Sequence, residues 1–135
     1  MSKIIESISD IISLYDVFIL DQWGVMHDGY KGYDLAINSV EKLIRENKKL
    51  IIISNSSKRK SSSIGRLKSL GFDKSNFIEV MTSGEMIWQE LSTSINNYGN
   101  DLKNCLHIYD SSKEDGLEFR NGLEKINFVS KINDA

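Results

Sequence analysis

The sequence is poor in cysteine, in long apolar runs and in any surplus of charge, and each shortage excludes a class of protein. Cys105 is the only cysteine, so no disulfide can form within the chain. No stretch approaches the roughly 18 apolar residues that a membrane-spanning helix needs. The 17 basic and 19 acidic residues nearly cancel, so the charge gives no reason to expect nucleic acid or an anionic membrane as a partner.

What the chain contains is typical of a globular protein. It is 40% hydrophobic and 27% charged, and its 135 residues suffice for one domain, or for one domain and part of another. The N-terminus carries early acidic residues and no long apolar core, so we expect no secretory signal. We therefore expect a reducing cytoplasm, in which Cys105 is a buried structural thiol within an apolar run.

The spacing of the apolar residues predicts strands and helices in strict alternation. Strands are expected at residues 16–21, 50–53, 77–81, 105–109 and 127–130. Helices are expected at residues 2–14, 34–47, 59–70, 82 to about 91, and 114–124. The first two strands are apolar without a polar face, which is typical of a parallel sheet covered on both sides. The alternation predicts an α/β fold, in which a parallel sheet is flanked by helices.

Local signals predict where some of these elements begin and end. Gly71 follows the helix at 59–70, at the position where a left-handed C-terminal cap is needed. Thr82 and Glu85 have the spacing of a capping box at the start of a helix. The polar run at residues 96–100 predicts a boundary, which divides the chain into residues 1–98 and 99–135.

Polar residues stand where the predicted strands end, at the edge of a parallel sheet where ligands bind. Asp21 follows the first strand, and its carboxylate could attack phosphorus if a cation such as Mg²⁺ offset the charge. Ser54 ends the second strand and could hold a phosphoryl oxygen. The next residues, Ser56 among them, could donate backbone N–H groups, and Lys58 adds positive potential. This pattern predicts phosphate chemistry.

At these residues the chain resembles the haloacid dehalogenase superfamily, and within it the class IIA (NagD-like) phosphatases. The run from Asp21 to Gly29 is similar to that family's first motif, and Ile51 to Ser57 is similar to its second. Residues 77–85 resemble the segment that precedes the class IIA cap.

The resemblance implies an incomplete Rossmann-like core at residues 1–98, followed by the beginning of an α/β cap at 99–135. It implies that Asp21 is the nucleophile, that Ser54 binds phosphate, and that Asn55 positions phosphate or substrate. It also implies that Mg²⁺ is bound by Asp21 and by the backbone carbonyl of Trp23. The substrate would be a small phosphorylated metabolite.

Two departures from the family pattern lower the expected activity. Trp23 occupies the position of the family's second Asp, which acts as general acid and base, and an indole cannot shuttle a proton. His27 and Asp28 are the nearest groups that could substitute. The resemblance also implies a Lys and a Mg²⁺-binding acidic pair that follow a complete cap. After Ser83 this chain offers no acidic pair at the end of an apolar strand, so we expect a weak or inactive phosphatase. General acid–base catalysis typically contributes about 10²–10⁴-fold.

Two other functions compete with a phosphatase. One is a non-catalytic remnant that binds a phosphorylated ligand or a partner protein, which Trp23 and the missing acidic pair favour. The other is a phosphoacceptor receiver domain, which the third strand disfavours because it ends in Thr82 and not in an acid. An incomplete sheet also leaves apolar faces, so we expect either self-association or pairing with a missing C-terminal half.

Overall fold

The computed structural model describes residues 4–97, 104–112 and 115–135, in two compact units. The first unit comprises residues 1–54 and 63–81, and the second comprises residues 55–62 and 82–135. The boundary predicted near residue 98 falls at residues 98–103, outside the described residues, and stays a prediction.

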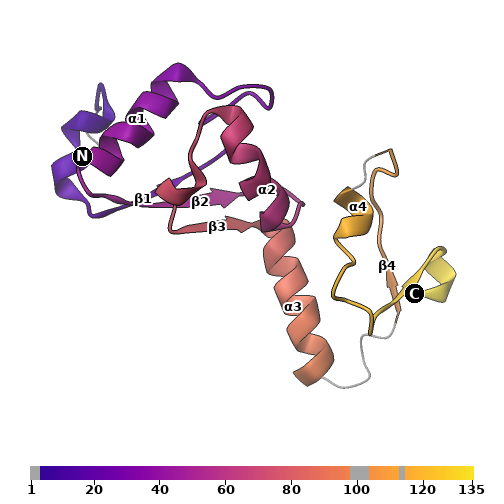
Figure 1. Ribbon diagram of the computed structural model, residues 1–135. Coiled ribbons are helices and arrows are strands. Elements are labelled where there is room, and N and C mark those ends of the chain that lie inside the picture. Colours follow the sequence, from indigo (N-terminus) through magenta and orange to yellow (C-terminus); the bar gives the residue numbers. More distant parts are fainter. Residues whose placement is uncertain (1–3, 98–103, 113–114) are drawn as a thin grey trace. The chain divides into compact units, whose positions relative to one another are not determined.

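The first unit is built on a three-stranded sheet in the order β1-β2-β3 (Figure 1). Its strands are β1 (Val17–Leu20), β2 (Lys49–Ser54) and β3 (Glu79–Thr82). Its helices are α1 (Asp34–Arg45) and most of α2 (Lys60–Leu67). β1 and β2 are parallel, with Leu20 paired to Ile52. The predicted alternation of strands and helices is therefore confirmed here, with boundaries shifted by a few residues.

One face of this sheet carries the hydrophobic core. Phe18 on β1 and Leu50 and Ile52 on β2 are buried. They pack in one cluster with Val40 and Leu43, which are the buried residues of α1. Alternate residues of a strand point to opposite faces, so these strand residues share one face. The apolar residues of α1 and the inward-facing residues of β1 and β2 therefore form one hydrophobic core.

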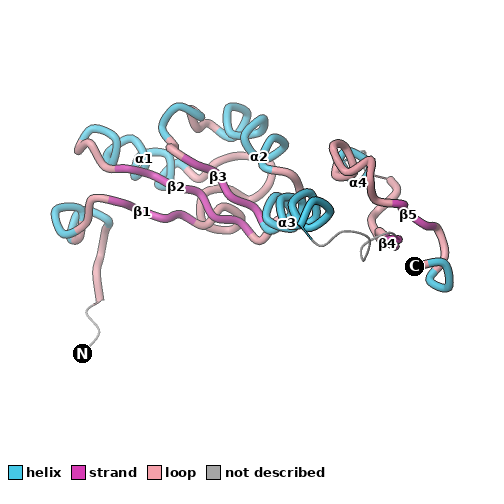
Figure 2. Tube along the Cα trace, turned by 90° about the horizontal axis from the view of Figure 1, so that it is seen from below, coloured by secondary structure: helices cyan, strands magenta, loops and turns pink. Residues whose placement is uncertain are grey.

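The opposite face of the sheet is exposed, against the expectation of a sheet covered on both sides. Val17, Ile19 and Ile53 are 44%, 62% and 49% exposed, and they alternate with the buried residues along β1 and β2. Figure 2 shows the reason, because α1 and α2 lie on the same side of the strands. In the described part of this unit, the second face keeps its apolar side chains in contact with solvent.

The helix predicted over residues 2–14 is wrong in type. Among the described residues this segment forms two short 3₁₀ helices, η1 (Ile8–Asp10) and η2 (Ile12–Leu14). Ser7 caps η1, and the carboxylate of Asp10 accepts hydrogen bonds from the N–H groups of Glu6 and Ser7. The apolar spacing reflects packing rather than an α-helix, because Ile8, Ile11 and Ile12 pack against the core.

The helix predicted at 59–70 is confirmed in outline. It forms α2 and continues as the 3₁₀ helix η3 (Lys68–Leu70). Gly71 then takes the left-handed conformation at φ 87°, and the N–H of Phe72 donates to the Leu67 carbonyl, 2.9 Å away. A side chain at this φ would be strained, which is why glycine signals the end of a helix.

The second unit repeats the alternation on a smaller scale. It contains α3 (Ser83–Asn97), β4 (Asn104–Leu106), α4 (Asp115–Glu118) and β5 (Asn127–Val129). β4 and β5 are parallel, as a strand–helix–strand unit requires. α4 is shorter than predicted, because the chain turns at Gly122, whose φ is +85°. Leu123 and Ile126, just after this turn, are buried.

No helix within the described part of the chain is both long enough and apolar enough to cross a membrane.

The two faces of β2 predict opposite outcomes for neighbouring substitutions. Ile52 is fully buried and Ile53 is 49% exposed. Ile52→Ala should lower the free energy of unfolding by about 2–5 kcal/mol, because it removes packed methyl groups and leaves a cavity. Ile53→Ala should cost about 1 kcal/mol or less, because little buried area is lost. Urea denaturation of both variants measures the difference, and equal losses would mean that the second face is covered in solution.

Candidate functional site

The register of the first two strands brings Asp21 and Ser54 to the same edge of the sheet. Leu20 at the end of β1 pairs with Ile52, so Asp21 follows the pair by one residue and Ser54 by two. Neighbouring strands lie about 4.8 Å apart. Asp21 is exposed and Ser54 is buried. The predicted nucleophile and the predicted phosphate ligand thus end adjacent parallel strands, and their chemical roles stay a prediction.

The carboxylate of Asp21 is oriented by the backbone that follows it. Its Oδ1 accepts a hydrogen bond from the N–H of Gln22, 2.8 Å away. Gln22 is itself buried, and its carbonyl accepts a hydrogen bond from the N–H of Met26. Met26 is only 2% exposed. The loop after β1 is therefore anchored in the core, which fixes the direction in which Asp21 leaves the sheet.

Trp23 packs across this loop while remaining 62% exposed. Its ring lies edge-on to the His27 ring, with centroids 5.8 Å apart. A Cβ at Gly29 would lie 2.4 Å from the Trp23 ring, so only glycine leaves room for the indole there. The Trp23 side chain therefore packs within this loop.

His27 and Asp28 stabilise the same loop and are poor substitutes for a catalytic acid. His27 is buried, and its Nδ1 accepts from the N–H of Gly29 at 3.0 Å. Burial and the nearby charge of Arg66 lower the pKa of His27, so its ring is neutral near pH 7. The Asp28 carboxylate accepts from the N–H groups of Lys31 and Tyr30, which lowers its pKa.

The continuation of the second motif, which includes Asn55, Ser56 and Lys58, belongs to the second unit. Asn55 is exposed, and Ser56 and Lys58 are half-buried. The Ser56 hydroxyl accepts from the N–H of Lys58 at 3.3 Å. The Ser56 carbonyl accepts from the N–H of Gly84 at 3.0 Å. These hydrogen bonds give the loop a defined backbone conformation. Backbone N–H groups can bind a phosphate only when the loop that carries them is ordered in this way.

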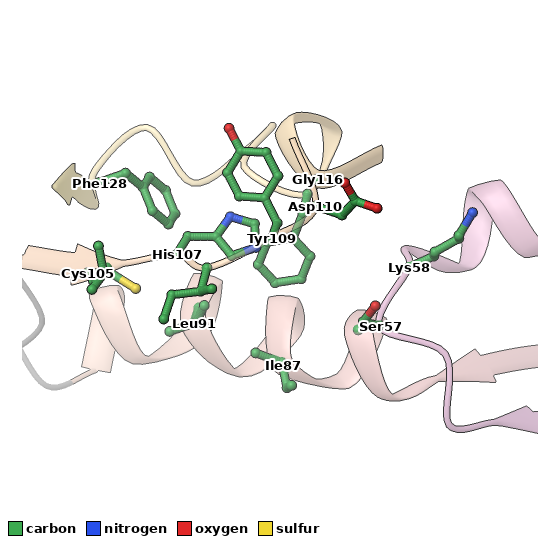
Figure 3. A pocket seen from close by; sticks show the side chains of 14 residues that line it. Ser57, Lys58, Ile87, Leu91, Cys105, His107, Tyr109, Asp110, Gly116 and Phe128 are labelled. Carbon is green, nitrogen blue, oxygen red and sulfur yellow. The ribbon is translucent and has the colours of Figure 1, made fainter. Parts of the chain in front are cut away.

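The same loop is packed tightly against the start of α3. A Cβ at Gly84 would lie 2.0 Å from the Ser57 carbonyl oxygen and 2.6 Å from that of Lys58. The Lys58 carbonyl also accepts from the Thr82 hydroxyl at 2.6 Å. Ser57 and Lys58 line one end of a cavity in this unit (Figure 3). Glycine at position 84 therefore allows the loop of Ser57 and Lys58 to pack close to α3, where these two residues line the cavity.

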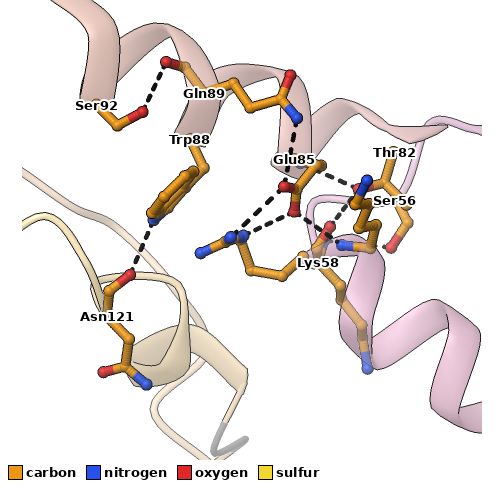
Figure 4. Close-up of polar contacts among 10 residues, drawn as sticks. Ser56, Lys58, Thr82, Glu85, Trp88, Gln89, Ser92 and Asn121 are labelled. Atoms are coloured by element: carbon orange, nitrogen blue, oxygen red, sulfur yellow. Dashed lines mark hydrogen bonds and ion pairs between the residues drawn. The ribbon is translucent and has the colours of Figure 1, made fainter. Parts of the chain in front are cut away.

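An ion pair between the buried Glu85 and the half-buried Arg59 holds this arrangement together, and no local sequence pattern predicts it. The Glu85 carboxylate accepts from Arg59 Nε at 2.8 Å and from the N–H of Lys60 at 3.1 Å (Figure 4). The Arg59 guanidinium lies over the Trp88 ring, 3.7 Å from its centroid. The charge-assisted hydrogen bond from Arg59 lowers the pKa of Glu85 in spite of its burial.

The capping box predicted from Thr82 and Glu85 is half confirmed. The N–H of Glu85 donates to the Thr82 hydroxyl at 3.0 Å, as a capping box requires. The Glu85 carboxylate is instead bonded to Arg59 and Lys60, on the loop after β2. The spacing of Thr82 and Glu85 is a signal for the cap, whereas nothing in the local sequence links Glu85 to a residue 26 positions away.

A metal ion would find hard oxygen donors near Asp21. Within the described ranges, no three His, Cys, Asp or Glu side chains converge as a metal cluster would require. The Asp21 carboxylate and the Trp23 carbonyl are the kind of oxygen ligands that Mg²⁺ prefers. Mg²⁺ typically takes one or two carboxylates and completes its octahedron with water and substrate phosphates. The donor set therefore fits Mg²⁺ in chemistry, and it supplies only part of the coordination.

Comparisons with known proteins agree with the fold. A family model for haloacid dehalogenase-like hydrolases matches residues 18–118, which is most of the chain. The structure is similar to that of a hydrolase of the haloacid dehalogenase-like family from Brucella suis 1330, with a TM-score of 0.75 and 22% sequence identity. The match covers 95% of this chain and 43% of that one, so this chain spans less than half its length. No curated protein matches the chain in sequence. The predicted α/β, Rossmann-like fold is confirmed.

The Glu85–Arg59 pair predicts a pH-dependent stability. Glu85→Gln should lower the free energy of unfolding at pH 7 by about 1–3 kcal/mol, because it removes a charge-assisted hydrogen bond and leaves Arg59 without its carboxylate. The folded-state pKa of Glu85 lies below its ordinary value of 4.5. The stabilisation is therefore complete above pH 4.5 and disappears as the pH falls through the folded-state pKa.

Urea denaturation between pH 3 and pH 8 measures the difference between the two proteins. We expect that difference to be constant near neutrality and to shrink in acid, as Glu85 itself becomes protonated. The exposed Glu118 provides a matched control, because Glu118→Gln should change the stability little at any pH. A Glu85 effect that is independent of pH would contradict the ion pair.

Proposed function

Since this chain belongs to the haloacid dehalogenase-like hydrolase family, we propose that it handles a small phosphomonoester through Asp21 and Ser54. The observation that carries the proposal is the placement of these residues at the ends of two adjacent parallel strands, with Asp21 exposed to solvent. An exposed carboxylate and a hydroxyl at the ends of adjacent strands suit attack on phosphorus and retention of a phosphoryl oxygen. The class IIA assignment rests on the motif resemblance.

In the proposed reaction, the Asp21 carboxylate attacks phosphorus and the bond from phosphorus to the leaving alcohol oxygen breaks. The product is an aspartyl phosphate and an alcohol, whose oxygen takes a proton from solvent because Trp23 has none to give. Water then cleaves the aspartyl phosphate, which releases inorganic phosphate and restores Asp21. Ser54, Asn55, Ser56 and Lys58 are the residues proposed to hold the phosphoryl group. Mg²⁺, bound through Asp21 and the Trp23 carbonyl, would offset the negative charge of the phosphate.

Turnover of this chain should be slow. Trp23 cannot protonate the leaving group or activate water, and general acid–base catalysis is typically worth about 10²–10⁴-fold. An activated aryl phosphate needs less help, because its leaving group departs without a proton. 4-Nitrophenyl phosphate with Mg²⁺ is therefore the substrate on which weak activity is easiest to detect.

Asp21→Asn should reduce that turnover to the rate measured without protein, because an amide cannot form the phosphoryl intermediate. Asp16, which lies at the opposite end of β1 and is fully exposed, provides a matched control. Asp16→Asn should keep the activity of the unaltered chain. Release of 4-nitrophenol is followed by absorbance, and equal turnover in the Asp21 and Asp16 variants would refute the role of Asp21.

The second candidate function is binding of a phosphorylated ligand without hydrolysis, and the specific observation that favours it is Trp23. The indole packs on Gly29 and His27 instead of presenting an acid. Calorimetry with phenyl phosphate and Mg²⁺ separates the two functions. Binding that Ser54→Ala weakens, with no release of inorganic phosphate, would favour this candidate over the phosphatase.

We also propose that further polypeptide covers the second face of the sheet, either a second copy or a C-terminal half. Val17, Ile19 and Ile53 place large apolar side chains there, and parallel sheets are normally covered on both faces. The expectations of a small phosphorylated metabolite as ligand and of a cytoplasmic location remain predictions.

The isolated chain should therefore self-associate through this face. Ile19→Lys should shift the chain towards monomer, because it places a charge in the middle of the apolar surface. Tyr30→Lys is the matched control, since Tyr30 is 92% exposed on the loop after β1. Sedimentation velocity over a range of concentrations measures the association. An unaltered chain that stays monomeric at every concentration would contradict self-association through this face.

A further inference from the structure

The second unit contains a cavity of about 370 Å³, and of the residues proposed to hold phosphate only Lys58 lines it. This volume lies within the range of about 300–1,000 Å³ that is typical of small-molecule sites. Figure 3 shows Ile87 and Leu91 of α3 on one side of the cavity, and His107 and Tyr109 on the other. All of its lining residues belong to the second unit.

Aromatic rings dominate the wall that faces α3. The ring centroid of His107 lies 4.9 Å from that of Tyr109, 5.2 Å from that of Phe119 and 6.1 Å from that of Phe128. All four rings line the cavity. Rings at these separations present both faces and edges, which are the surfaces that a further ring contacts most favourably. The opposite wall, made by Ile87 and Leu91, is aliphatic.

Arg120 contacts the rings of this wall and sets the protonation of His107. Its guanidinium carbon lies 5.3 Å from the ring centroid of Tyr109 and 4.7 Å from that of Phe128. Its Nε donates to Nδ1 of His107 at 3.4 Å. A neutral imidazole that accepts at Nδ1 carries its proton on Nε2. Burial and the charge of Arg120 both lower the pKa of His107, which keeps the ring neutral near pH 7.

Glycine at position 116 makes room for the ring wall. A Cβ there would lie 2.1 Å from Cδ2 of Tyr109 and 2.7 Å from its Cγ. The Tyr109 ring could not occupy its present position beside any other residue at 116. The cavity wall is therefore shaped by backbone as well as by side chains.

We propose that this cavity is a binding site for a planar, uncharged aromatic or heteroaromatic ring. The ring lies between the aromatic wall of His107, Tyr109 and Phe128 and the aliphatic floor of Ile87 and Leu91. His107 Nε2–H is the donor for a ring heteroatom. Neither Asp21 nor Ser54 lines the cavity, and Lys58 lies at the end away from the rings of His107 and Phe128, so the proposal goes beyond the proposed function and can be tested without a phosphate group.

Three neutral probes of equal size test the preference for a ring. Benzyl alcohol has an aromatic ring, 4-pyridinemethanol adds a heteroatom that accepts a hydrogen bond, and cyclohexylmethanol is saturated. We expect the two aromatic probes to bind about tenfold more tightly than cyclohexylmethanol, because a ring–ring contact is worth about 0.5–1.5 kcal/mol beyond burial. Saturation-transfer NMR at pH 7.5 on the full chain measures the three affinities.

The two histidines of the chain report where the probes bind. His107 lines the cavity, whereas His27 is buried in the first unit. We expect the imidazole resonances of His107 to shift on titration with benzyl alcohol while those of His27 do not. Because this measurement uses the unaltered chain, it does not depend on whether a variant folds.

A matched pair of substitutions on α3 tests the cavity itself. Ile87→Trp should fill the cavity and abolish binding, because Ile87 is part of its floor. Met86→Trp adds the same ring at the neighbouring exposed position, which is not part of the lining, and should leave binding unchanged. Any of three results would overturn the proposal: no shift of His107, equal affinity for cyclohexylmethanol, or full binding in the Ile87 variant.

Discussion

The parallel pairing of β1 with β2 is the constraint on which the first unit depends. The register that joins Leu20 to Ile52 decides which side chains enter the core and which residues meet at the sheet edge. A slip of one residue would exchange the buried and exposed sets of a whole strand. Because Leu50 and Ile52 are fully buried, hydrophobic burial resists such a slip. The same packing that stabilises the unit therefore keeps Asp21 and Ser54 at the same edge of the sheet.

That constraint also accounts for what the sequence could and could not predict. The apolar runs predicted the strands, and hence the edge at which Asp21 and Ser54 stand. They could not predict that one face would stay exposed, since Ile19 and Ile53 look the same in sequence as Phe18 and Ile52. Which face is covered depends on where α1 and α2 pack, and that is a tertiary property.

The contacts that escaped prediction join residues far apart in the chain. The pairing of Arg59 with Glu85 and the gathering of rings around His107 have no periodic signal. The isoleucines that precede β1 have helical spacing, yet capping by Ser7 and packing on the core favour 3₁₀ turns there. Local signals succeeded where the backbone itself was the cause, as at Gly71 with its positive φ.

Trp23 separates ligand binding from proton transfer, the two tasks of a phosphatase site. Under the proposed function, ligand binding relies on Asp21 and Ser54, and on a backbone carbonyl that any residue at position 23 supplies. Proton transfer relies on the side chain at position 23, where the indole packs against Gly29 and His27. A loss of about 10²–10⁴-fold in rate corresponds to about 3–5 kcal/mol of transition-state stabilisation. None of that energy comes from ground-state binding, so a chain with Trp23 can keep affinity for a phosphomonoester while its turnover is slow.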